Sequence, residues 1–186
     1  MSDRIRTVTA DLSRTAGDVR AAFGDLSFEQ LNWKPAAKKW SVAQCLDHLI
    51  VTHSLYFPLF DKLATADAKL TLWERVSPFS GFFGRFLIKS LDPANTKPMK
   101  TTSRAYPSSS DIDRDIVARF GEHQSQLISH LETLPAEIDT SMIITSPLMG
   151  VVTYSLKDAL TFLPMHCRRH FDQAKRVVAM EGFPSR

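Results

Sequence analysis

The chain has 186 residues, of which 44% are hydrophobic and 23% charged, a composition that excludes disordered and collagen-like proteins. Its 23 basic and 20 acidic residues leave a net charge of +3, and no run of five like charges occurs, so we expect no nucleic acid partner. Two cysteines allow at most one disulfide, which favours a cytoplasmic location. We see no signal peptide and no apolar run of membrane-spanning length, and we expect one domain over residues 1–186.

Apolar residues recur at steps of three and four in four segments, which is the period of an amphipathic helix. Ser41 and Ser155 are expected N-caps, because Gln44 and Asp158 stand three residues later and complete a capping box. Pro58 is expected to kink or end the second helix. The predicted helices cover residues 5–23, 41–60, 110–134 and 155–177.

Two stretches lack this period, residues 66–109 and 138–153. The first is predicted to form short helices followed by a loop rich in Pro, Thr and Ser. No run with the strand period is long enough to build a sheet. The sequence therefore predicts an all-α fold, an up-down-down-up or related four-helix bundle with a long crossover between the second and third helices.

Within the crossover, the segment PFSGFFGRFLI at residues 78–88 places several aromatic side chains next to Arg85 and Lys89. Three interpretations remain open for it. It covers a pocket, it packs in the interface of a homodimer, or it lies on a membrane surface. We favour the first two interpretations and therefore expect no membrane partner.

His166 and His170 form the motif HCRRH, so they differ by only about 40° around the helix and their Cβ atoms lie roughly 6 Å apart. Two imidazoles at this spacing can bind one cation, and the alternative is a pair of hydrogen-bonded core histidines. His48 occupies the edge of the apolar stripe of the second helix. In a simple up-down bundle this helix runs parallel to the fourth, and a small offset would bring His48 to the same depth.

The strings LNWKPAAKKWSVAQCLDHL and HCRRHFDQ, more than a hundred residues apart, resemble the DinB-like superfamily, also called DinB/YfiT-like. The resemblance covers essentially the whole chain and implies a four-helix bundle with a divalent metal held by three histidines. Carried over to this sequence, the metal ligands are His48, His166 and His170, and the metal is zinc or nickel. The resemblance also implies chemistry of two kinds, metal-dependent hydrolysis and transfer reactions that use a low-molecular-weight thiol such as bacillithiol or mycothiol.

Three neutral histidines leave the ion its double positive charge and an open coordination position, which can activate either a bound thiol or a bound water. We therefore expect a metal-dependent enzyme for a small-molecule substrate, either an S-transferase or a hydrolase. Alternatives are a non-catalytic metal-binding or stress-response protein and a bundle that binds a membrane or a partner. No catalytic residue can be assigned, because Asp47 and Asp172 point about 100° away from the nearest histidine.

The other chemically capable residues receive structural interpretations. His53 lies about 140° from His48 around the second helix, so we expect it in the core or at its edge, off the metal. His123 and His130 share one face of the third helix and are expected to be half-exposed. Cys45 and Cys167 are expected to be small core residues.

Overall fold

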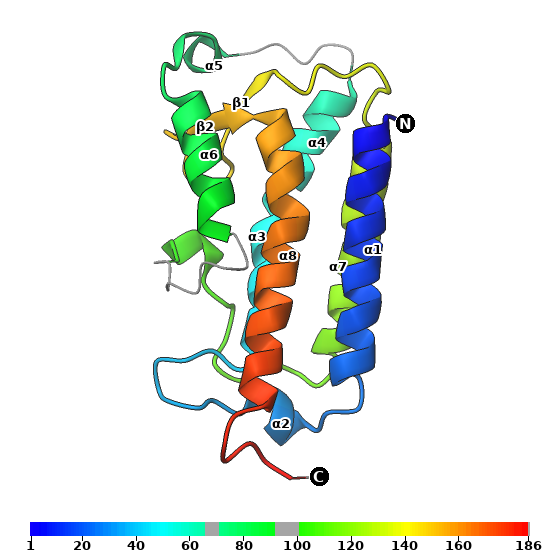
Figure 1. Cartoon of the computed structure of the whole chain (residues 1–186), viewed down its shortest axis with the longest axis vertical. Helices are drawn as coiled ribbons and strands as arrows, with labels where there is room; N and C mark the ends of the chain where they lie inside the picture. The colour runs from blue at the N-terminus through cyan, green and yellow to red at the C-terminus, as the bar shows by residue number, and fades with distance from the viewer. Residues whose placement is uncertain (66–70, 92–100, 186) are drawn as a thin grey trace.

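The structure is a computed structural model that describes residues 1–65, 71–91 and 101–185 (Figure 1). Four helices form the bundle: α1 (Asp3–Phe23), α3 (Val42–Ser54), α7 (Ile116–Glu132) and α8 (Leu156–Val178). Both α1 and α3 pack against α7 and against α8, so the four helices enclose one apolar core. The four-helix bundle predicted from the sequence is confirmed. Core side chains with at most 1% exposure include Leu12, Phe23, Leu46, Leu49, Phe120, Leu127 and Leu163.

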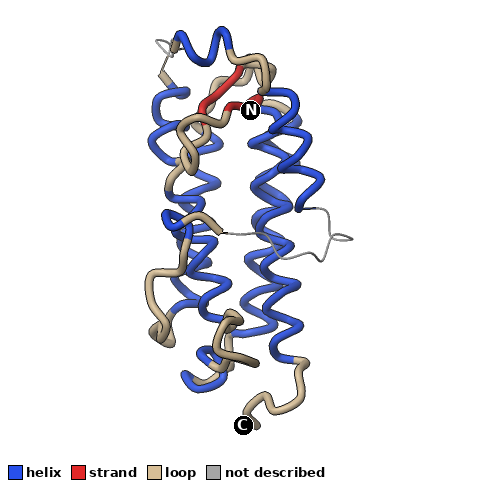
Figure 2. Tube along the Cα trace, turned by 90° about the vertical axis from the view of Figure 1, so that its left-hand side faces the viewer, coloured by secondary structure: helices blue, strands red, loops and turns tan. Residues whose placement is uncertain are grey.

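Shorter elements connect the bundle helices: α2 (Phe28–Asn32), α4 (Phe57–Ala64), α5 (Leu72–Val76), α6 (Ser80–Leu91) and the 3-10 helix η1 (Ser103–Ala105). In Figure 1, α6 lies outside the bundle beside α8, and α5 lies above it at one end. The side view in Figure 2 shows the same elongated shape, with the small strand pair at that end. Among the described residues, no helix is both long and apolar enough to cross a bilayer.

The directions of the helices follow from which residues meet. Tyr56, after the end of α3, hydrogen bonds to Tyr154 just before α8, whereas His48 meets His166 further along α8. The helices α3 and α8 are therefore antiparallel, as in an up-down-down-up bundle and unlike a simple up-down bundle, in which they would run parallel (Figure 1). The reason is the long crossover: it returns the chain to the end of the bundle where α3 began, so α7 runs alongside α3 and α8 runs back.

Two of the four predicted helices have different bounds in the structure. The second helix is divided, because α3 ends at Ser54 and α4 begins at Phe57 with Pro58 in its first turn. Proline has no N–H to donate to the carbonyl of Ser54, so the helix breaks before it. The third helix begins at Ile116 rather than near residue 110. The side chain of Asn32 bonds both the N–H and the carbonyl of Ile112, and these bonds hold the preceding segment out of the helix.

The expectation that no strands form is also wrong. Strand β1 (Ile143–Thr145) pairs with β2 (Thr153–Ser155) in an antiparallel hairpin, with Ile144 opposite Tyr154. Each strand has only three residues, which is too short for a period of two to be recognised in the sequence. The hairpin leads directly into α8 and positions its N-terminus.

Candidate metal centre

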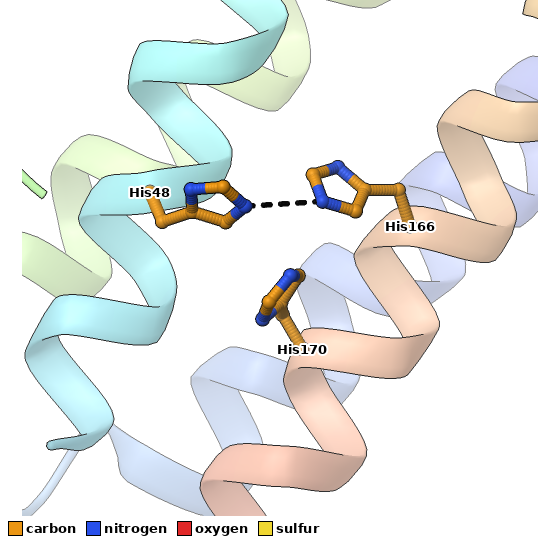
Figure 3. A group of neighbouring side chains, drawn as sticks. All are labelled: His48, His166 and His170. Atoms are coloured by element: carbon orange, nitrogen blue, oxygen red, sulfur yellow. Dashed lines mark hydrogen bonds between the residues drawn. The ribbon is translucent and has the colours of Figure 1, made fainter. Parts of the chain in front are cut away.

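The three histidines of the predicted site lie on α3 and α8, and capping boxes fix where both helices begin. Ser41 pairs with Gln44 at the start of α3, and Ser155 pairs with Asp158 at the start of α8, as the sequence predicts. From these starts, His48, His166 and His170 all point into the space between the two helices (Figure 3). Their side chains are buried, with only 4–8% of each residue exposed.

Two ligand atoms of this cluster lie at a distance that suits one metal ion, and the third is close to both. The Nε2 atoms of His48 and His166 are 3.1 Å apart (Figure 3), and one ligand nitrogen from each of the three residues lies within 4.8 Å of the others. Two nitrogens bound at 2.0–2.1 Å to a common ion are about 2.9 Å apart at a right angle and about 3.4 Å apart at the tetrahedral angle. The observed separation falls between these values.

The crossover fixes the orientation of His48. Its Nδ1–H donates to the carbonyl of Ala105 in η1, so the lone pair of Nε2 points toward His166. The same stretch of crossover is bound to two more side chains of α3. Asp47 accepts from the N–H of Ser108, and the Gln44 amide donates to the carbonyl of Ser109. Asp47 therefore anchors the crossover and faces away from the histidine cluster.

On the other side, His166 contacts His53, a residue that sequence reasoning placed in the core without a role. His53 is fully buried, and its Nε2 lies 3.2 Å from Nδ1 of His166. Nδ1 of His53 is 3.9 Å from Sγ of Cys167, whose thiol donates to the amide oxygen of Gln124 at 3.6 Å. When His166 offers its Nε2 lone pair to an ion, its Nδ1–H donates to His53, whose own Nδ1–H then donates to the sulfur. The ring N–H groups of His166 and His53 and the thiol of Cys167 therefore each have an acceptor.

Burial keeps the cluster neutral. Removal from water lowers the pKa of His48, and it holds the pKa values of His166 and His170 well below the ordinary value of 6.5. Mutual repulsion among the imidazoles and the positive charge of Arg169 act in the same direction. Near neutral pH, all three rings are therefore in the form that can bind a metal.

His170 supplies the observation that most directly points to an absent ligand. Its Nδ1 is buried and, within the described chain, has no hydrogen-bond partner of normal geometry, although Gln173 is near enough to favour its charged form. The indole of Trp40 stacks on His170 at 5.7 Å and lies 4.8 Å from the ring of His48, while Tyr106 packs edge-on against Trp40. The donor set and this unpartnered nitrogen fit a divalent cation.

Comparison with known proteins agrees with this architecture. A family model described as the DinB superfamily matches residues 11–174. The chain belongs to the DinB superfamily. Its fold is similar to that of YfiT from Bacillus subtilis, with a TM-score of 0.58 and 14% sequence identity over 96% of this chain and 89% of that one. YfiT is described as a probable metal-dependent hydrolase with an unusual four-helix bundle topology. No curated protein matches the chain.

In this DinB-superfamily chain the two histidines of α7 lie in different environments, and the prediction that both are half-exposed is wrong for His123. His123 is 5% exposed, stacks on Phe57 and lies 3.0 Å from the hydroxyl of Ser54 through Nε2. His130 is partly exposed and pairs with Asp61 at 2.7 Å. The periodicity of α7 placed both residues on one face but could not show that α4 would cover it.

The two cysteines are core residues, as expected. Cys45 and Cys167 are both free and buried, and burial raises the pKa of Cys45 to about 12 and that of Cys167 further still. A thiol with so high a pKa carries almost no thiolate near neutral pH, so neither cysteine is activated as a nucleophile, and neither belongs to the cluster of three histidines.

A cavity of about 430 Å³ lies between α1 and α8, away from the histidines. It contains the surface ion pair between Arg168 and Asp18 and shares no residue with the cluster. Its lining carries two acidic and two basic side chains, Asp18, Asp172, Arg168 and Lys175.

We predict that His123 makes the metal-free protein less stable in acid. Burial lowers its pKa to about 4, whereas in the unfolded chain it titrates near 6.5. Its contribution is therefore fully present above pH 6.5 and is lost as the pH falls toward 4, at up to about 1.4 kcal/mol per pH unit. Urea unfolding with chelator present, at pH 7.5 and 5.5, measures this loss. The drop should be smaller in His123→Leu by about 1 kcal/mol; equal drops in the wild type and His123→Leu would contradict the prediction.

Proposed function

We propose that the chain binds one divalent ion, zinc or nickel, through His48, His166 and His170, and uses it to hydrolyse a small-molecule substrate. The observation that carries this proposal is the position of the two Nε2 atoms, 3.1 Å apart, with the opposite nitrogen of each ring already held by a protein group. A histidine that ligates a metal characteristically donates its other ring N–H in this way. The description of YfiT as a probable metal-dependent hydrolase supports the same reaction class.

The ion would supply Lewis acidity, which lowers the pKa of bound water to about 7 and so provides hydroxide under physiological conditions. The chain's own residues do the rest. Ala105 and His53 hold the rings of His48 and His166 in the ligating tautomers. Because the three ligands are neutral, they leave the double positive charge of the ion undiminished. Trp40 covers the rings of His48 and His170 and keeps that side of the site apolar.

A thiol is the second candidate for the activated group, which would make the protein an S-transferase acting on a small electrophile. An ion with its full charge deprotonates a coordinating thiol. The chain's two cysteines are buried with raised pKa values, so the thiol would be a low-molecular-weight co-substrate. Both reactions rest on the same three ligands, and they differ in the second substrate.

The metal claim is tested by elemental analysis of purified protein after incubation with zinc or nickel. We expect about one ion per chain in the wild type and less than about a tenth of that in His166→Ala, because two ligands remain. His130→Ala removes a histidine that lies on another helix and should bind like the wild type. A wild type without metal, or a His166→Ala variant that binds equally, would refute the site. Circular dichroism of each variant controls for folding.

The nature of the activated group is tested by two assays on the metal-loaded protein. Hydrolysis predicts turnover of a panel of activated esters and amides without added thiol, and loss of this rate in His166→Ala. Thiol transfer predicts that a generic electrophile is consumed only when a low-molecular-weight thiol is present. Metal-dependent turnover that requires the thiol would overturn the hydrolase proposal in favour of the transferase.

The contact between His53 and His166 predicts an indirect effect on metal affinity. His53→Leu removes the acceptor for Nδ1–H of His166, and we expect a 10–100-fold rise in the metal dissociation constant. His53→Gln keeps an acceptor oxygen and should recover part of the affinity. Competition titration with a chromophoric chelator measures both. If His53→Leu binds as tightly as the wild type, His53 has only a packing role.

A further inference from the structure

The helix α6 carries two apolar stripes, about 100° apart around its axis, although it lies outside the bundle. On the inner side, Phe83, Leu87 and Leu91 pack against the core. On the outer side, Phe79, at the turn before the helix, and Phe82 and Phe86 are each 56–59% exposed. Their spacing of three and four places them in one stripe, and the rings of Phe82 and Phe86 stack at 6.4 Å. Isolated exposed apolar residues are common, but an aromatic stripe along one helix marks a contact surface.

Contacts of α5 and α6 with the hairpin and with α8 keep this stripe on the outside of the protein. A Cβ atom at Gly84 would lie 2.1 Å from the carboxylate of Asp158, so α6 approaches the start of α8 as closely as a glycine allows. Before α6, the hydroxyl of Ser77 bonds that of Thr153 in β2, and Glu74 accepts from the N–H of Thr145 in β1. These three contacts fix α5 and α6 against the hairpin and α8. The aromatic rings therefore cannot turn into the core without breaking them.

Within α5 and α6 the exposed charges all have one sign. Arg85 and Lys89 are four residues apart on α6 and border the stripe along one side, and Arg75 is exposed on α5. Glu74, the one acidic residue within α5 and α6, is 8% exposed and engaged by Thr71 and Thr145. The preceding helix adds Leu72, Trp73 and Val76, which are 45–76% exposed. Aromatic and aliphatic side chains bordered by Lys and Arg are typical of a helix that lies in a membrane interface.

The geometry points to an anionic lipid surface as the partner of α5 and α6, with Phe79, Phe82 and Phe86 in the interface and Arg85 and Lys89 at the headgroups. The positive charge of this face argues against a second copy of this chain as the partner. An isologous dimer through this face would bring together two surfaces that are both positive, with no exposed acidic residue on α5 or α6 to pair with them. A phospholipid surface with anionic headgroups offers the opposite charge and an apolar layer beneath it. This surface is independent of the proposed metal centre.

Co-sedimentation with vesicles tests the inference. The full-length wild type should bind vesicles of phosphatidylglycerol and phosphatidylcholine and bind far less to phosphatidylcholine alone. Each basic residue near such a surface is worth about 1 kcal/mol, or about fivefold, so Arg85→Gln with Lys89→Gln should weaken binding about 30-fold. Phe82→Ser with Phe86→Ser should weaken it by at least about tenfold. Lys38→Gln with Lys39→Gln removes the same charge from an exposed loop elsewhere and should change binding less than about threefold.

A wild type that ignores anionic vesicles, or that binds neutral vesicles equally well, would overturn the inference. So would equal weakening by the two lysine- and arginine-to-glutamine pairs, because the effect would then be one of net charge alone. Sedimentation velocity tests the other candidate partner, a second copy of this chain. A wild-type dimer that Phe82→Ser with Phe86→Ser dissociates, without vesicle binding by the wild type, would assign the face to a second copy. Metal content measured on the same variants should equal that of the wild type.

Discussion

The antiparallel contact between α3 and α8 is the constraint on which the rest of the site depends. It brings His48, early in α3, opposite the middle of α8, where one turn of helix separates His166 from His170. With α8 reversed, the same sequence would present different residues to His48. The hairpin of β1 and β2 sets the start of α8, and the capping box at Ser155 fixes its first turn. The hairpin and this cap therefore fix how far along the bundle the two histidines of α8 lie.

Burying three imidazoles costs free energy unless their six ring nitrogens find partners. The protein provides partners for Nδ1 of His48, with Ala105, and for Nδ1 of His166, with His53, and leaves Nδ1 of His170 without one in the described chain. The Nε2 atoms of His48 and His166 face each other, and one cation would satisfy them together with a nitrogen of His170. The remaining histidines continue the row, since His53 lies beside both His166 and His123, and Phe57 stacks between His123 and His130. The buried histidines thus form a polar row across a core that is otherwise mostly apolar.

The sequence predicts what depends on local chemistry. Capping boxes and apolar spacing give the four helices and the inward faces of α3 and α8, and the HCRRH motif together with the family resemblance gives the three clustered histidines. Contacts between residues far apart in the sequence cannot be predicted in this way. The backbone of Ile112 is held by Asn32, eighty residues away, so the start of α7 cannot be read from its own segment. The angle between His53 and His48 around the helix correctly predicts that the two rings point in different directions. The contact of His53 with His166 could be predicted only if the direction and axial offset of α8 were known.

The length of the crossover now has a physical explanation. Because α3 and α7 run in the same direction, the chain must return about 26 Å, the length of the 17 residues of α7, which about eight extended residues would span. Residues 65–115 fill this connection, several times the minimum. Each doubling of loop length adds only about 0.6 kcal/mol to the entropic cost of closing the loop, so a long connection destabilises the fold little. One part forms α5 and α6 on the outside of α8, and the last part delivers Ala105 to His48. The same connection that reverses α8 relative to α3 thus also completes the histidine site that this reversal creates.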